Sequence, residues 1–238
     1  MINDKKILSV ITARAGSRGV PGKNFKHING TPLIVWSVNQ SLSSQYIDFT
    51  VVSSNSEKIR QCTEYAYTNK KYMFIDRPHE LATDISPNED TLIHAYKYVK
   101  KECKFDADLI INLQPTSPIR NNGLIDKCIE YIGDHDSLLT VKKIAPFFLY
   151  KNKDKFYQFD KSKLMHRPMR QQLHDDDFFY YDCGNLYIVS SKVLLNQHSR
   201  LGENFAVFVV DDKQGLQIDT KIDFEILDMV MARIKNNF

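Results

Sequence analysis

The chain has 238 residues, which is enough for one α/β domain with a sizeable core. A hydrophobic content of 42% beside 26% charged residues is typical of a soluble globular protein, and no apolar run approaches the length of a membrane span. The net charge of +3 is too small, and its cations are too interspersed with acids, to indicate a nucleic-acid-binding protein. The N-terminal segment MINDKKILSV lacks the apolar stretch of a signal peptide, and the four scattered cysteines include no C-x-x-C pair. We therefore expect a cytoplasmic protein without disulfides or a zinc site.

The first strong pattern is ILSVITARAGSRGVPGKN, residues 7–24. Its apolar start predicts a buried strand, and glycines in the loop that follows allow the backbone to approach a ligand closely. The glycines and cations of this loop are Gly16, Gly19, Gly22, Arg14, Arg18 and Lys23. Backbone amides combined with cationic side chains bind polyphosphates, so the loop is a candidate phosphate site. The alternative is an ordinary solvated basic loop between a strand and a helix.

Further along the chain, strand-like and helix-like patterns alternate. Strands are predicted at residues 49–54, 72–75, 108–113, 137–142, 185–190 and 205–210. Helices are predicted from an N-cap at Thr31 and Pro32 onward, at residues 56–67, 91–101 and 123–132, and in the last segment of the chain. This βαβ order predicts an α/β fold with a mostly parallel sheet.

A polar segment, QPTSPIR, follows the almost purely apolar strand at residues 108–113. Gln114, Thr116 and Ser117 offer hydrogen bonds at the carboxyl end of that strand, where ligands bind in open parallel sheets. Gln114 can donate and accept together, as reading a nucleobase edge requires. The alternative is a loop made rigid by its two prolines.

Residues 144–182 are rich in aromatic and charged residues but show no sustained helical or strand pattern. We interpret the segment as an arm or insertion at a subunit interface, because aromatic residues and arginine are enriched at such surfaces and a loop of this length needs a reason. Internal core is the alternative. His166 and His174 are eight residues apart with no third ligand nearby, so they are expected to be surface histidines.

The last segment of the chain carries the signature of a capped helix. Thr220 and Asp223 have the spacing of a capping box ahead of an apolar face. Asp219 directly precedes this box, and its role is either a helix cap or a metal ligand.

Several motifs occur in order along most of the chain, namely ITARAGSRGVPGKN, VVSSNS, DRPHELATD, LQPTSPIR, RQQL and IDTKIDF. Together they resemble the acylneuraminate cytidylyltransferase family, the CMP-sugar synthetases that couple CTP to sialic acids and related nonulosonic acids. The resemblance implies a single nucleotidyltransferase domain over residues 1–238, built as a Rossmann-like three-layer α/β/α sandwich. It also implies Mg²⁺ dependence and a homodimer formed partly by the extended arm at residues 144–182.

The resemblance also implies a role for each matching residue. Lys23 and Arg14 would be catalytic cations that, with magnesium, stabilise the charge released when a sugar hydroxyl attacks the α-phosphorus of CTP and pyrophosphate leaves. The nucleotide-binding positions would be Arg14, Ala15, Gly16, Ser17, Arg18, Lys23, Asn24, Arg77 and Ser86. The substrate-binding positions would be Gln114, Thr116, Ser117, Arg170 and Tyr181, and the metal positions Asp219 and Gln217.

Three departures from the family pattern bear on the acceptor. Gln217 stands where a first aspartate is common, and an amide oxygen is a weaker magnesium ligand than a carboxylate. Family members tend to have an arginine or lysine for the sugar carboxylate, whereas the regions around Phe148 and Tyr181 carry aromatic residues here. Cys183 stands before Gly184 where the family has an asparagine. The acceptor therefore either lacks a carboxylate or meets Arg170 or Lys142.

Two other functions stay open from the sequence. One is a related nucleotidyltransferase that uses another nucleotide, a sugar phosphate or a non-carboxylate acceptor, and the other is a non-catalytic nucleotide-binding module, for which Gln217 is the only support. A P-loop NTPase is disfavoured because the loop lacks the Gly-Lys-Ser/Thr ending. A dinucleotide dehydrogenase is disfavoured because the glycines are three apart and no acidic residue ends the second strand.

Overall fold

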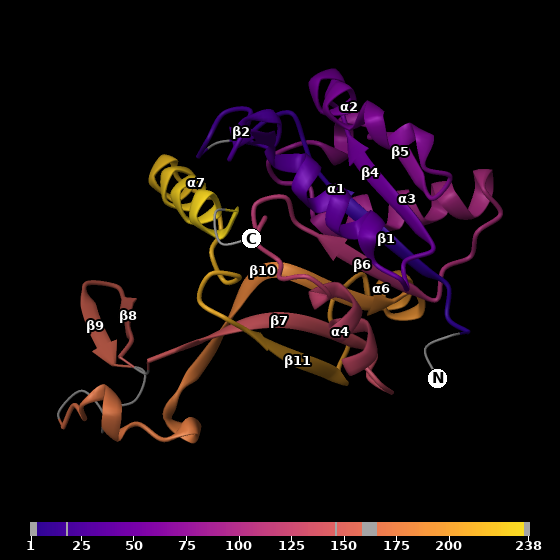
Figure 1. Cartoon of the computed structure of the whole chain (residues 1–238). Helices are drawn as coiled ribbons and strands as arrows, with labels where there is room; N and C mark the ends of the chain where they lie inside the picture. The colour runs from indigo at the N-terminus through magenta and orange to yellow at the C-terminus, as the bar shows by residue number, and fades with distance from the viewer. Residues whose placement is uncertain (1–3, 18, 146, 159–165, 236–238) are drawn as a thin grey trace.

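The computed structural model describes residues 4–17, 19–145, 147–158 and 166–235. A central seven-stranded sheet contains β1 (Ile7–Thr12), β4 (Phe49–Ser54), β5 (Tyr72–Asp76), β6 (Leu109–Leu113), β7 (Ser137–Ile144), β10 (Phe179–Ser190) and β11 (Phe205–Val210). The strand order is β11-β7-β10-β6-β1-β4-β5 (Figure 1). All neighbouring pairs are parallel except those of β10, which runs antiparallel to both β6 and β7. The mostly parallel sheet that the sequence predicts is confirmed.

Helices cover both faces of this sheet. The helices are α1 (Leu33–Ser43), α2 (Glu57–Thr63), α3 (Asn88–Glu102), α4 (Leu124–Tyr131), α6 (Ser191–Gln197) and α7 (Lys221–Lys235). One buried cluster joins α1, α2 and α4 to one face of the sheet, and a second joins α3 and α6 to the other. The arrangement is the expected three-layer α/β/α sandwich, with α7 packed beside these layers over a third cluster.

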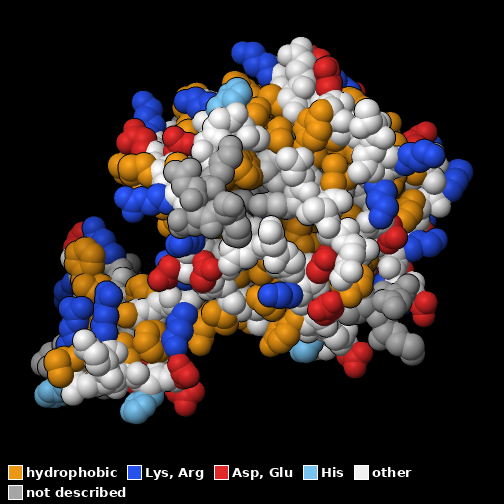
Figure 2. Space-filling view, in the orientation of Figure 1, with side chains coloured by type: hydrophobic (Ala, Val, Ile, Leu, Met, Phe, Trp, Pro, Cys, Tyr) orange, Lys and Arg blue, Asp and Glu red, His pale blue; other side chains and the backbone are white. Residues whose placement is uncertain are grey.

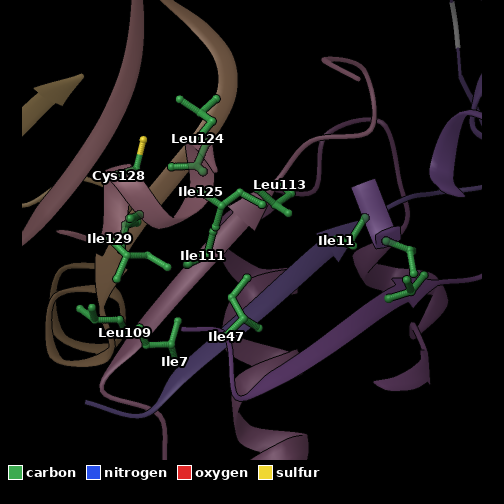
Figure 3. Close-up of a cluster of buried hydrophobic side chains, with 14 of the residues drawn as sticks. Ile7, Ile11, Ile47, Leu109, Ile111, Leu113, Leu124, Ile125, Cys128 and Ile129 are labelled. Atoms are coloured by element: carbon green, nitrogen blue, oxygen red, sulfur yellow. The ribbon is translucent and has the colours of Figure 1, made fainter. Parts of the chain in front are cut away.

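The side-chain alternation of β1 explains why its sequence is mostly apolar. Ile7 and Ile11 face the layer that contains α4, whereas Leu8 and Val10 face the layer that contains α3. Figure 3 shows the first of these layers, in which α4 side chains such as Ile125 lie over the strands. A parallel strand buried on both faces carries apolar residues at most positions, and Ser9 is the buried polar exception in β1.

Strand β10 is interrupted next to the end of β6. Asp182 pairs with Val141 and Tyr187 pairs with Leu139, so residues 183–186 of β10 lie opposite the single residue Thr140 of β7. Such a bulge bends a strand and changes the direction of its side chains. The bulge adjoins Leu113, the last residue of β6, which pairs with Leu186.

Residues 144–182 include a hairpin that the sequence did not predict. Strands β8 (Leu149–Asn152) and β9 (Lys155–Gln158) pair only with each other and project from the rest of the molecule (Figure 1). Their alternation is hidden in the sequence because both faces are exposed and carry aromatic residues, such as the stacked Tyr150 and Tyr157. β10 also begins at Phe179, six residues before the predicted start, because its first residues extend the ladder with β7 along this arm.

Smaller differences concern the ends of helices. Thr31 and Pro32 form the short strand β3, which pairs with β2 (His27–Ile28), so α1 begins at Leu33 and the predicted N-cap at Thr31 is wrong. The capping box of α7 is confirmed, since the amide of Thr220 donates to Asp223 Oδ2 and the amide of Asp223 donates to Thr220 Oγ1. His166 and His174 are exposed, as predicted. Among the helices of the described ranges, none has the length and apolar character to span a membrane.

Candidate functional site

A pocket of about 430 Å³ opens at the carboxyl ends of β1 and β6. Ten of the predicted site residues line it, and these are Arg14, Gly16, Ser17, Lys23, Asn24, Arg77, Ser86, Gln114, Thr116 and Asp219. Ligands bind at this edge of open parallel sheets because the loops after the strands meet there. Patterns in the sequence therefore pointed to residues of this pocket, although the lining extends along the chain from Thr12 to Asp219.

The glycine-rich loop lies directly against the segment that precedes α7. A Cβ built on Gly19 would overlap the carbonyl oxygen of Asp219, so only glycine permits this approach. Gly22 has φ +68°, in the left-handed region, and the ring of Phe25 covers it. Asn24 is buried and donates from Nδ2 to the Arg14 carbonyl, 3.1 Å away, which holds the loop closed. Gly19 and Gly22 thus have a steric role in the loop, whereas a Cβ at Gly16 would meet nothing within 4 Å.

Lys23 connects the loop to the same segment. Its Nζ donates to the carbonyl oxygen of Ile218 at 2.6 Å and lies 3.8 Å from Asp219 Oδ1. Burial lowers the pKa of the Lys23 ammonium; Asp219 opposes this shift and Arg14 adds to it. An ammonium that is partly stripped of water and whose carboxylate neighbour is 3.8 Å away is prepared to bind an anion.

Two arginines add positive charge to the pocket. Arg14 Nη1 lies 2.5 Å from Asp84 Oδ1 across the pocket mouth. Arg77 is buried and donates from Nη2 to the Ser53 carbonyl oxygen at 2.6 Å, and burial, with a smaller effect from Arg14, lowers the pKa of its guanidinium to about 10. The guanidinium stays charged at neutral pH, so the pocket offers three cations to a polyanion.

Several lining residues escaped the sequence analysis. Asn88 and Thr91, in the first turns of α3, face the pocket, and Asn88 Nδ2 donates to Asn112 Oδ1 at 2.8 Å. Arg120, which does not line the pocket, is buried underneath it and donates to the carbonyl oxygens of Gln114 and Asn185 at 2.9 and 2.6 Å. The start of α3 at Asn88 was predictable, because a proline directly precedes it. No local sequence pattern predicts the buried position of Arg120.

Five predicted residues do not line this pocket. The Ala15 amide donates to Asn55 Oδ1 and Ser117 Oγ to the Cys183 carbonyl oxygen, so both support the walls from behind. Gln217 is half-buried beside Gly184. Tyr181, whose hydroxyl donates to the Gly215 carbonyl oxygen, and Arg170, exposed on the arm, lie outside it. These residue roles stay predictions, and Arg18 falls outside the described residues.

Comparison with known proteins shows the family. A family model described as "Cytidylyltransferase" matches residues 8–221, which include the whole pocket. The chain belongs to the cytidylyltransferase family. The enzyme is therefore a nucleotidyltransferase, as the resemblance of its motifs implied.

Two relatives and one solved structure illustrate the similarity. The chain is 29% identical over 236 residues to "Post-translational flagellin modification protein B" of Campylobacter coli, with 95% of each chain covered. It is 28% identical to "CMP-N,N'-diacetyllegionaminic acid synthase" of Legionella pneumophila, over 95% of this chain and 96% of that protein. A CMP:2-keto-3-deoxy-manno-octonic acid synthetase in complex with CTP has the same fold, with a TM-score of 0.69 at 19% identity over 96% of this chain and 99% of that one.

Proposed function

We propose that this cytidylyltransferase couples CTP to a sialic-acid-like nonulosonic sugar, giving a CMP-sugar and pyrophosphate. The observation that carries the proposal is the placement of Arg14, Lys23 and Arg77 around a glycine loop, in a chain that matches the cytidylyltransferase model over residues 8–221. The relative named as a CMP-N,N'-diacetyllegionaminic acid synthase, similar over nearly its whole length, supports a nonulosonic acceptor.

The pocket suits an in-line displacement at phosphorus. The acceptor oxygen forms a bond to the α-phosphorus and releases its proton to water, and the bond to the bridging oxygen of pyrophosphate breaks. Negative charge then accumulates on the leaving oxygens, next to the cations of the loop. Lys23 stabilises that charge from a fixed position, because a hydrogen bond to the Ile218 carbonyl oxygen already orients it, and Arg14 adds a second positive charge.

We propose that Mg²⁺ assists the reaction. Asp219 presents an exposed carboxylate at the pocket rim. Gln217, the other metal position that the motif resemblance implies, lies beside Gly184 and does not line the pocket. The described residues contain no cluster of three or more His, Cys, Asp or Glu side chains that could hold a metal alone. One carboxylate fits Mg²⁺ nonetheless, because this ion is commonly held by one or two carboxylates together with substrate phosphates and water. When bound, it would neutralise phosphate charge.

We also propose a homodimer that involves the arm at residues 144–182. The arm exposes large apolar side chains, among them Phe156 at 68% and Met169 at 64%, which is unfavourable for a surface that stays in water. In Figure 2 lysine and arginine side chains are visible on this projecting part, where Lys151, Lys155 and Arg170 are exposed.

Because the reaction consumes CTP, an intracellular nucleotide, we propose that the enzyme acts in the cytoplasm.

The test is a pyrophosphate-release assay of the full chain with Mg²⁺. CTP, UTP, GTP and ATP are each combined with N-acetylneuraminic acid, N,N'-diacetyllegionaminic acid and common sugar phosphates. We expect release only with CTP and a nonulosonic acid. Release with a sugar phosphate or another nucleotide would instead favour a related nucleotidyltransferase, and CTP binding without release would favour a non-catalytic module.

A further inference from the structure

The bulge at residues 183–186 of β10 is held by hydrogen bonds from three directions. Thr140 Oγ1 accepts from the Leu186 amide at 3.0 Å. Asn185 donates to the carbonyl oxygens of Ile119 and Gln214 at 2.8 and 2.7 Å. From below, Arg120 donates to the Asn185 carbonyl oxygen. These hydrogen bonds fix the backbone conformation of the bulge.

The bulge presents Gly184 with φ +60°, a conformation that favours glycine. A Cβ at this position would lie 2.5 Å from Gln217 Nε2 and 3.1 Å from Gln114 Oε1. The missing side chain therefore leaves room for two primary amides, one from each neighbouring segment. Gln217 turns its donor group, rather than its oxygen, toward the space that it shares with Gln114.

The nearest charged side chains on β10 and β7, Asp182 and Lys142, already have partners within the protein. Asp182, the nearest carboxylate along β10, accepts hydrogen bonds from the Gly184 amide and from the Tyr187 hydroxyl. Lys142, on the neighbouring strand, is paired with Asp212 at 3.0 Å. Gln114 lines the pocket on its β10 side and Gln217 lies next to it beside Gly184, whereas Arg14, Lys23 and Arg77 approach from the loops after β1 and β5. This side thus offers neutral donors and acceptors, and the other side offers positive charge.

We propose that Gln217 is a specificity residue for the acceptor, and that with Gln114 it binds an uncharged hydroxyl or acylamino group of the sugar above Gly184. The assignment rests on the proposed function. An amide donates and accepts at once, which matches a hydroxyl or an acylamino group, but it cannot neutralise a carboxylate. A site built to hydrogen-bond such a group discriminates against sugars that lack it, because its polar atoms are then left without partners.

The test compares Gln217→Ala and Gln217→Glu with the wild-type chain. Apparent KM is measured for CTP and for whichever of N-acetylneuraminic acid and N,N'-diacetyllegionaminic acid the wild type uses, and Mn²⁺ affinity is measured by electron paramagnetic resonance with CTP present. Gln61→Ala, an exposed glutamine on α2, is the matched control. We expect the acceptor KM to rise about fivefold to tenfold in Gln217→Ala, with the CTP KM and the Mn²⁺ affinity changed less than about twofold.

Gln217→Glu separates acceptor binding from metal binding. A carboxylate keeps the size of the side chain but loses the donor that faces Gln114, so we expect the acceptor KM to rise at least as much as in Gln217→Ala. A metal ligand would behave oppositely, since Glu should strengthen Mn²⁺ binding and preserve turnover. Weaker Mn²⁺ binding in Gln217→Ala with an unchanged acceptor KM would overturn the proposal, as would a rise confined to the CTP KM. If the wild type releases no pyrophosphate with CTP and either sugar, the proposed function fails and this assignment fails with it.

Discussion

Gly19 and Asp219 lie in contact across the pocket, so close that a Cβ on Gly19 would overlap the carbonyl oxygen of Asp219. The contact joins the first loop of the chain to the segment before its last helix. Lys23 strengthens the same junction through the Ile218 carbonyl oxygen. The phosphate-binding loop and the proposed metal carboxylate therefore form one unit, and a change on either side should disturb the other.

Gly19→Ala should separate the two segments. The new methyl group cannot fit against backbone, so the loop must move, and we expect kcat/KM for CTP to fall at least about tenfold, since small displacements of binding groups are costly in catalysis. Thermal unfolding measured beside activity distinguishes local from global damage. Gly16→Ala is the steric comparison, because a Cβ there meets nothing within 4 Å, and it should leave the Tm unchanged. A Gly19→Ala enzyme with wild-type kinetics would refute the close approach.

Lys23→Ala should remove a catalytic cation and leave the fold intact. We expect kcat for pyrophosphate release to fall about a hundredfold, which is the typical loss when a fixed group that stabilises transition-state charge is deleted. Lys70→Ala, an exposed lysine outside the pocket, is the control and should retain activity. Near-normal turnover of Lys23→Ala would exclude Lys23 from catalysis.

The lowered pKa of Lys23 predicts a pH dependence. Its ammonium is present below that pKa and is lost as the pH rises through it, which happens below the ordinary value of 10.5 because the side chain is buried. The kcat/KM for CTP should therefore decline on the alkaline side before an ordinary lysine would titrate. Lys23→Arg, which keeps its charge, should move this decline to higher pH. An identical profile for both enzymes would show that another group titrates.

Residues that act through local chemistry were predictable from the sequence. Arg14, Lys23 and Asn24 stand in a glycine-rich loop directly after a buried strand, and Gln114 directly follows another, so strand ends alone place them at one edge of the sheet. The fold was predictable for the same reason, because apolar strands and amphipathic helices alternate along most of the chain.

Features that depend on distant contacts were not predictable. Arg120 is buried because α1 and β10 both supply hydrogen-bond acceptors to it, and the bulge at Gly184 is defined by the pairing of β10 with β7 around Thr140. The β8–β9 hairpin carries aromatic residues on both faces, so no alternation marks its strands. The partner of Arg14 is likewise a tertiary property, since Asp84 is 70 residues away.

The ion pair between Arg14 and Asp84 should compete with the nucleotide. Asp84→Asn removes the competing carboxylate, and we expect the KM for CTP to fall by up to about fivefold, the range of a partly exposed ion pair. Asp134→Asn removes one exposed negative charge elsewhere and controls for net charge. A raised KM in Asp84→Asn would show that Asp84 supports binding instead.

Arg120 should be a main determinant of stability around the pocket. Arg120→Met leaves the buried carbonyl oxygens of Gln114 and Asn185 without their donor, and we expect the free energy of unfolding in urea to fall by about 2–4 kcal/mol. Arg120→Lys should not restore it, because one ammonium cannot replace the planar guanidinium fork. Arg233→Met, exposed on α7, should change stability little. Equal stability of the Arg120 and Arg233 variants would contradict the role.

The central claim is that the pocket transfers CMP to a nonulosonic acid. It is tested most directly by mass spectrometry of the products formed from CTP, Mg²⁺ and either N,N'-diacetyllegionaminic acid or N-acetylneuraminic acid. We predict a CMP-sugar and an equal amount of pyrophosphate with CTP, and neither product with UTP, GTP or ATP. The absence of any CMP-sugar from both acids, or equal product yields with all four nucleotides, would contradict the claim.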